Sequence, residues 1–92
     1  MIVQNPKRQT MKEIRKDFDG YCVCIADRQT NERDWTLAGK VIVYDKWMKD
    51  VRIQAKTIPR ERYPGGWHFT DLTNFDGIIE SGIIEVISLE KN

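Results

Sequence analysis

The chain has little of the chemistry on which most enzymes and metalloproteins depend. Its 92 residues include two cysteines and one histidine. The phosphate-binding loop, the dinucleotide-binding glycine motif, the zinc-protease motif and the nucleophile elbow are all missing from the sequence. The single histidine, His68, stands between two aromatic residues, which favours a structural role over a catalytic one. We therefore expect no enzymatic activity, no catalytic residues, and neither a cofactor nor a metal.

Cys22 and Cys24 are too few and too close for most cysteine chemistry. On a strand, residues two apart point to the same face, but the extended backbone between them is unfavourable for a disulfide. A metal site would need two further ligands, and His68 belongs to another element. The sequence predicts two reduced thiols that pack as small buried hydrophobes.

Long hydrophobic runs are also missing: none approaches the roughly 20 residues that span a bilayer. The first residues, Met1 to Arg8, lack the apolar core of a secretory signal. With 40% hydrophobic and 32% charged residues, the composition is typical of a folded soluble chain. We expect a single domain over residues 1–92, with residues 1–9 as an arm or edge strand, in a cytoplasmic protein of bacterial or phage type without membrane contact.

What the chain does have is a strong hairpin signal between Gly20 and Asp45. Two apolar runs, residues 21–26 and 37–44, flank a polar linker from Asp27 to Thr36. β-branched and aromatic residues dominate both runs, which is typical of paired strands. Because both faces of each run are apolar, we expect the hairpin to be covered on both sides.

A short helix is predicted before the hairpin. Thr10 and Glu13 have the spacing of a capping box. Met11, Ile14 and Phe18 follow as one apolar stripe, which is expected to dock on the sheet.

Residues 46–57 fit two templates. A helix capped by Asp45 exposes Ile53, whereas a strand over residues 50–58 buries it. We favour the helix because it places one set of apolar side chains on a single face: Trp47, Met48, Val51, Ala55 and Ile58.

The predicted fold is α+β, a small antiparallel sheet with two helices packed on it in the order α-β-β-α-β-β. After a loop from Arg60 to Gly66, one strand is expected over residues 67–72, a turn at Ile78–Ile79, and the last strand over residues 83–89. The alternative is a mostly-β small barrel in which residues 50–58 form a strand.

Residues 11–56 resemble small uncharacterised prokaryotic helix–hairpin–helix domains of unknown function. The resemblance is carried by Glu13-Ile14 and Lys16, by Phe18-Asp19-Gly20-Tyr21, by the run from Gly39 to Lys46, and by Asp50-Val51. The chain departs from the pattern at Cys22, where those domains have a large residue. The resemblance implies a helix after the hairpin and brings no functional residue with it.

The charged residues are unevenly distributed. Residues 46–62 carry six Lys or Arg against two acids, a net charge of +4, whereas the chain from Asp71 onward has a net charge of −4. The total of +1 argues against a dedicated binder of the phosphate backbone, but a local basic patch is compatible with nucleic acid. The candidate nucleic-acid contacts are Lys49, Arg52 and Lys56.

A second set of candidates combines aromatic and basic residues. Tyr, Trp and Arg are enriched at the energetic centres of protein interfaces. The run from Arg60 to His68 contains all three types, and Trp35 is a large ring in a polar linker. The candidate partner-binding residues are Trp35, Arg60, Arg62, Tyr63, Trp67 and His68.

The sequence does not identify a function by a motif, so the expectation rests on these surfaces. It is a small non-enzymatic protein-interaction module, with a phage or mobile-element accessory protein as its setting. The alternative is a nucleic-acid-binding protein that uses the basic segment 46–62. The partner is expected to be another protein or a second copy of the chain, because two short helices would cover only one face of a sheet that is apolar on both. A homodimer at micromolar concentration follows from that reasoning.

Overall fold

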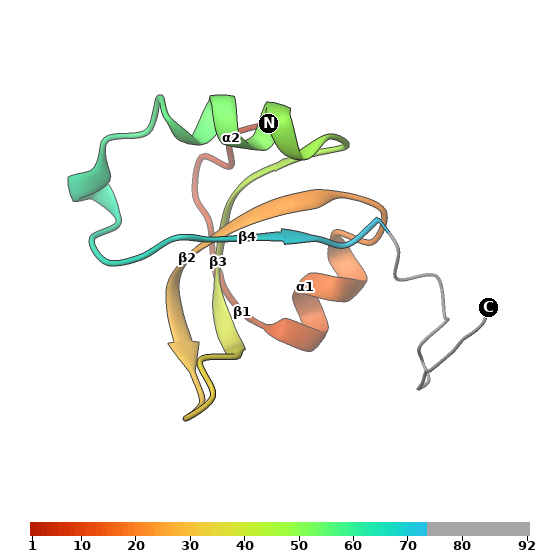
Figure 1. The fold of residues 1–92 in the computed structure, drawn as a ribbon, viewed down its shortest axis with the longest axis vertical. Helices are drawn as coiled ribbons and strands as arrows, with labels where there is room; N and C mark the ends of the chain where they lie inside the picture. Colours follow the sequence, from red (N-terminus) through yellow and green to blue (C-terminus); the bar gives the residue numbers. More distant parts are fainter. Residues whose placement is uncertain (74–92) are drawn as a thin grey trace.

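A computed structural model describes residues 1–73, which form a four-stranded antiparallel sheet in the order β1-β3-β2-β4, with two α-helices (Figure 1). Along the chain, the elements are β1 (Arg8–Thr10), α1 (Met11–Asp17), β2 (Cys22–Thr30), β3 (Thr36–Asp45), α2 (Met48–Ala55), the 3₁₀ helix η1 (Arg60–Arg62) and β4 (His68–Asp71). No helix in this part of the chain is long and apolar enough to cross a membrane. The turn and last strand expected at Ile78–Ile79 and over residues 83–89 lie outside the described residues.

The α+β class with a four-stranded antiparallel sheet is confirmed, but the order α-β-β-α-β-β is not the observed one. The first element is the edge strand β1, whose three polar residues Arg8, Gln9 and Thr10 gave no periodic signal. Nearer the N-terminus, Ile2 forms an isolated bridge with Val43 of β3. The barrel alternative is wrong, because α2 occupies the segment that would have to be a strand.

The central hairpin is longer than its apolar runs. β2 and β3 pair as far as Thr30 and Thr36, so the connecting loop covers only residues 31–35 and the expected linker from Asp27 to Thr36 is wrong. Polar residues can pair here because the ladder needs only backbone groups. The Arg28 side chain strengthens the end of the hairpin near its loop by donating to Thr36 Oγ1 at 2.8 Å and to the Asp34 carbonyl at 3.0 Å.

Each face of the sheet has its own hydrophobic core. Because successive strand residues point to opposite faces, β2 supplies both cores. On one face Cys22, Cys24 and Ala26 pack with α2, whose contribution is Val51 and Ala55. On the other face, α1 covers the second core with Ile14, which packs with Val23, Ile25, Val41 and Leu72.

The two helices therefore lie on opposite faces of the sheet. The expectation that the hairpin is covered on both sides is confirmed, but the covering comes from within the chain. The premise that the helices leave one face for a partner or second copy is wrong. Self-association stays a prediction without this support.

The start of α1 is the predicted one, whereas the start of α2 is not. Thr10 and Glu13 form the predicted capping box: the Glu13 amide donates to Thr10 Oγ1 at 3.2 Å, and the Thr10 amide donates to Glu13 Oε1 at 2.8 Å. The N-cap of α2 is Trp47 instead of Asp45, and its side chain makes no capping bond. Asp45 accepts instead from Gln54 Nε2 at 2.8 Å, so it ties the end of β3 to the last turn of α2.

The burial pattern along α2 confirms the helical interpretation of this segment. Ile53 is 61% exposed, whereas Val51, Ala55 and Ile58 are buried. Trp47 is 65% exposed and not part of the core, because the helix starts one residue after it.

At Gly39, β3 lies so close to β2 that a side chain has no space. A methyl group at Gly39 would lie 2.5 Å from Ile25 Cγ2 and 3.1 Å from the Ala26 carbonyl oxygen. Ile25 is fully buried, so its side chain has no free space into which to move. Glycine is thus required by packing at this position.

Replacing isoleucine by alanine at two positions will test the burial assignments. Ile14→Ala is expected to lower the free energy of unfolding by about 2–5 kcal/mol, because it leaves a cavity under α1. Ile53→Ala removes the same atoms from an exposed site and should stay within about 0.5 kcal/mol. Urea denaturation measures both values, and similar losses for the two variants would contradict the placement of α2.

Alanine at two glycines will test the close approach of the central strands. Gly39→Ala is expected to destabilise by about 1–3 kcal/mol through overpacking against Ile25. Gly66→Ala is the control, because a methyl group there meets nothing within 4 Å. Thermal and urea unfolding of both variants measures the difference, and a neutral Gly39→Ala would show that the strands can separate at this point.

Candidate functional site

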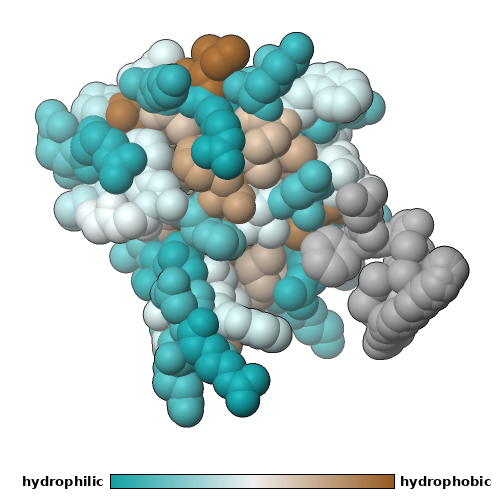
Figure 2. Space-filling view, in the orientation of Figure 1, coloured by the Kyte–Doolittle hydropathy of each residue, from teal (hydrophilic) through white to brown (hydrophobic). Residues whose placement is uncertain are grey.

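A groove runs between α2, η1 and β4, and Figure 2 shows the face that carries it, with apolar surface between α2 and β4 bordered by hydrophilic side chains. Its volume is about 490 Å³. Ala55 and Ile58 form an apolar floor with the half-buried rings of Trp67 and Phe69. Three cationic side chains complete the lining: Arg52, Lys56 and Arg60. We refer to these seven residues as the basic groove.

Two of the three cations are stacked on the rings of the floor. The Arg52 guanidinium carbon lies 4.5 Å from the centre of the Phe69 ring, and that of Arg60 lies 4.4 Å from the Trp67 ring. These distances are within the range of cation–π attraction. Trp67 is held further by Tyr63, whose carbonyl accepts from the indole Nε1 at 2.8 Å. The arginines are therefore held at the groove by the rings beneath them.

The cations of the basic groove are not neutralised by the rest of the described chain. None of the four ion pairs among residues 1–73 includes Arg52, Lys56 or Arg60. No acidic side chain of this part of the chain lines the groove. Because all three cations are exposed at the rim, the groove presents concentrated positive charge above an apolar surface.

The charges of Arg52 and Arg60 act on the Cys24 thiol, but they do not make it a reactive thiolate. Burial raises the pKa of its thiol to about 12, although the two arginines act in the opposite direction. Burial, and next the nearby Asp71 carboxylate, raise the pKa of the Cys22 thiol as well. Both cysteines are free and buried, as predicted. Neither is suited to act as a nucleophile at neutral pH, because the thiolate is the reactive form.

A second hollow, of about 300 Å³, lies on the α1 side of β4. It is lined by Met11, Arg15, Asp34, Trp35, Thr36, His68 and Thr70, and we refer to it as the Trp35 pocket. The ring of Trp35 is 67% exposed. Its backbone is held by Asn31, whose Oδ1 accepts from the Trp35 amide at 3.0 Å. The hairpin loop thus holds the backbone of Trp35 while its side chain is exposed.

The predicted partner-binding residues divide between the two hollows. Arg60 and Trp67 line the basic groove, with Tyr63 behind them, whereas Trp35 and His68 line the Trp35 pocket. Arg62 lies on η1 but lines neither. Burial is the main cause that lowers the pKa of His68, which favours the neutral imidazole.

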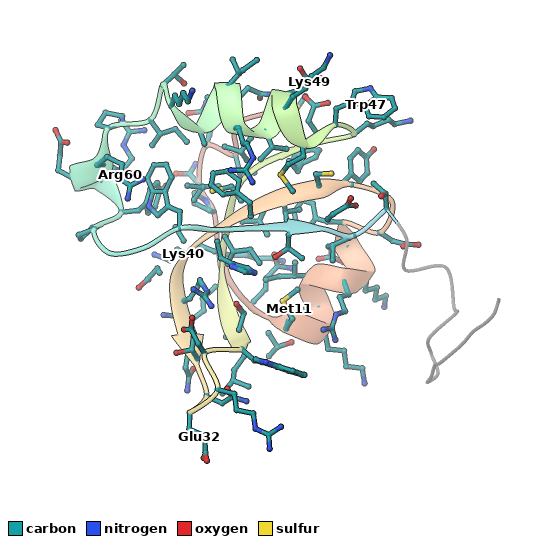
Figure 3. All side chains as sticks on the ribbon, in the orientation of Figure 1. Met11, Glu32, Lys40, Trp47, Lys49 and Arg60 are labelled. Atoms are coloured by element: carbon teal, nitrogen blue, oxygen red, sulfur yellow. The ribbon has the colours of Figure 1, made fainter. Side chains whose placement is uncertain are left out.

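The predicted nucleic-acid contacts divide in a similar way. Arg52 and Lys56 line the basic groove, but Lys49 does not. Lys49 lies in the first turn of α2 beside Trp47, whereas Arg60 lies on η1, beyond the opposite end of that helix (Figure 3). The prediction missed Phe69 of β4, which lines the basic groove together with Trp67, the residue just before the strand. Period-two alternation in the run Trp67-His68-Phe69 was the available signal.

Comparison with known proteins adds no assignment. No protein-family model, curated protein or solved structure matches the chain significantly. The resemblance over residues 11–56 therefore stays an expectation from sequence. Within the described residues, no three His, Cys, Asp or Glu side chains come together in a way that could hold a metal ion.

Thiol labelling will test the burial of the cysteines. At pH 8, Cys24 in the folded protein should react with an aromatic disulfide reagent at least about a thousandfold more slowly than in urea. A pKa near 12 in place of 9 lowers its thiolate fraction by about that factor, and burial adds to it. A Lys12→Cys variant, whose new thiol is exposed on α1, provides the fast-reacting control. Rapid labelling of Cys24 in the native state would contradict the assigned environment.

Proposed function

We propose that this protein is a small non-enzymatic interaction module that binds an acidic segment of a protein partner in the basic groove. The observation that carries the proposal is the set of three cations, Arg52, Lys56 and Arg60, above an apolar floor. They have no carboxylate partner among the described residues. A partner that brings carboxylates to the rim and apolar side chains to the floor satisfies both parts of the groove.

The composition of the groove supports a protein partner over nucleic acid. Base stacking requires open ring faces, but Arg52 covers one face of Phe69 and Arg60 covers one face of Trp67. The overall charge of +1 also leaves little long-range attraction for a polyanion. Nucleic acid is still the second candidate, because Arg52 and Lys56 share one groove with Arg60 and an arginine plane can itself stack on a base.

The chemistry of the site also supports a binding role over an enzymatic one. The thiol nearest the groove is protonated at neutral pH, and the one histidine lines the other pocket. The groove itself contains cations and apolar groups but no side chain that could act as a general base near pH 7.

Binding of a labelled peptide that alternates Glu with Ile will test the proposed function. Arg60→Gln and Lys56→Gln are each expected to weaken binding about tenfold, because each removes a charge-assisted hydrogen bond. Arg62→Gln and Lys49→Gln are matched controls, since they remove the same charges from η1 and α2 outside the groove. Fluorescence anisotropy gives the affinities, and circular dichroism verifies that each variant is folded.

Two results would count against this function. Equal losses for Arg60→Gln and Arg62→Gln would show that the groove has no special role. Tighter binding of a single-stranded oligonucleotide, with steep loss between low and moderate salt and an equal contribution from Lys49, would favour the nucleic-acid candidate instead.

A further inference from the structure

β4 is one of the two edge strands of the sheet and lies between the basic groove and the Trp35 pocket. It pairs with β2 on one side, and no strand of residues 1–73 lies on its other side. In Figure 1, β4 runs between α2 on one side and α1 on the other, with its outer edge toward the viewer. An unpaired edge is a template for a further strand.

The backbone register identifies which groups of β4 point outward. Immediately after β4, the Leu72 amide donates to the Tyr21 carbonyl at 2.9 Å, and the Leu72 carbonyl accepts from the Gly20 amide at 3.3 Å. Leu72 therefore directs both groups toward the β2 side. Because strand residues alternate in this respect, Phe69 and Asp71 direct their N–H and C=O groups to the outer edge. This spacing fits a new strand that bonds through every second residue.

From Trp67, the residue just before β4, to Thr70 within it, the side chains alternate between the two hollows. Trp67 and Phe69 line the basic groove, whereas His68 and Thr70 line the Trp35 pocket. A strand added at the outer edge would continue this alternation, with one set of side chains beside the rim cations and the other beside the Trp35 ring. The cations favour carboxylates in the first set, and the exposed indole favours apolar groups in the second.

We infer that the outer edge of β4 is a strand-addition site for an extended protein segment that alternates acidic and apolar residues. This inference rests on the proposed function and adds the binding mode. Main-chain bonds to Phe69 and Asp71 supply affinity, and the two hollows supply specificity for alternate side chains. Charge complementarity with Arg52, Lys56 and Arg60 favours an acidic protein segment as the added strand.

Backbone methylation of the Glu–Ile peptide will test the inference. Two peptides carry the same number of N-methyl groups, in one at the Glu residues and in the other at the Ile residues. Strand addition needs the N–H groups of one set only, so one peptide should bind at least about tenfold more weakly than its parent while the other stays within about twofold. A Trp35→Ala variant should also weaken the parent peptide but not a Glu–Ser peptide, which has no apolar set.

The possible results separate the two proposals. Equal affinity of both methylated peptides and the parent, with binding still sensitive to Arg60→Gln, overturns strand addition and leaves the groove as the site. A parent peptide that does not bind overturns both. The competing occupant of the β4 edge is a second copy of the chain, and sedimentation of the full chain tests it. A dimer that excess peptide does not dissociate would favour the second copy, provided that the peptide also fails to bind.

Discussion

The pairing of β2 with β3 is the interaction on which the rest of the molecule depends. From Cys22 to Ala26 the side chains of β2 are at most 2% exposed, although they point alternately to two faces. A strand that is buried on both sides needs a cover on each, and α1 and α2 supply one each. β1 and β4 then add to the outer edges of this pair. Loosening the pair at Gly39 would therefore affect both cores together.

The basic groove and the Trp35 pocket both follow from this arrangement of strands and helices. The edge strand β4 is only four residues long, and α2 and α1 flank it on opposite faces. The short strand leaves space at its border that neither helix fills. Arg52 of α2 and Lys56, the C-cap residue of that helix, both reach the groove because they lie about one helical turn apart on the same side.

Much of the fold could be predicted from the sequence because local signals agreed with tertiary packing. The capping box at Thr10 and the exposed position of Ile53 both follow from patterns within a few residues. The errors arise where tertiary contacts decide. Asp45 has the chemistry of a helix cap, but Gln54 in the last turn of α2 offers it a partner instead. Trp47 fits the predicted apolar face of the helix, but the helix begins only after it.

The candidate site was predictable in composition but not in geometry. Residue type alone selected Arg60 and Trp67, yet it grouped them with Trp35 and His68, which lie on the other side of β4. Which cations meet which rings depends on how α2 crosses the sheet edge, and no local pattern contains that information. Lys49 and Arg52 are three residues apart and look equivalent in sequence, but only Arg52 stacks on Phe69.

The stacking of two arginines on aromatic rings has a consequence for the entropy of binding. A long side chain that is free in solution loses rotational freedom when it contacts a partner, at a cost of about 0.5–1.5 kcal/mol. Arg52 and Arg60 are already restrained by Phe69 and Trp67, so much of that loss occurs during folding. Lys56 has no ring beneath it among the described residues and keeps its freedom until a partner arrives. The groove thus combines two preorganised charges with one adaptable charge, a combination suited to partners that share a carboxylate spacing but differ beyond it.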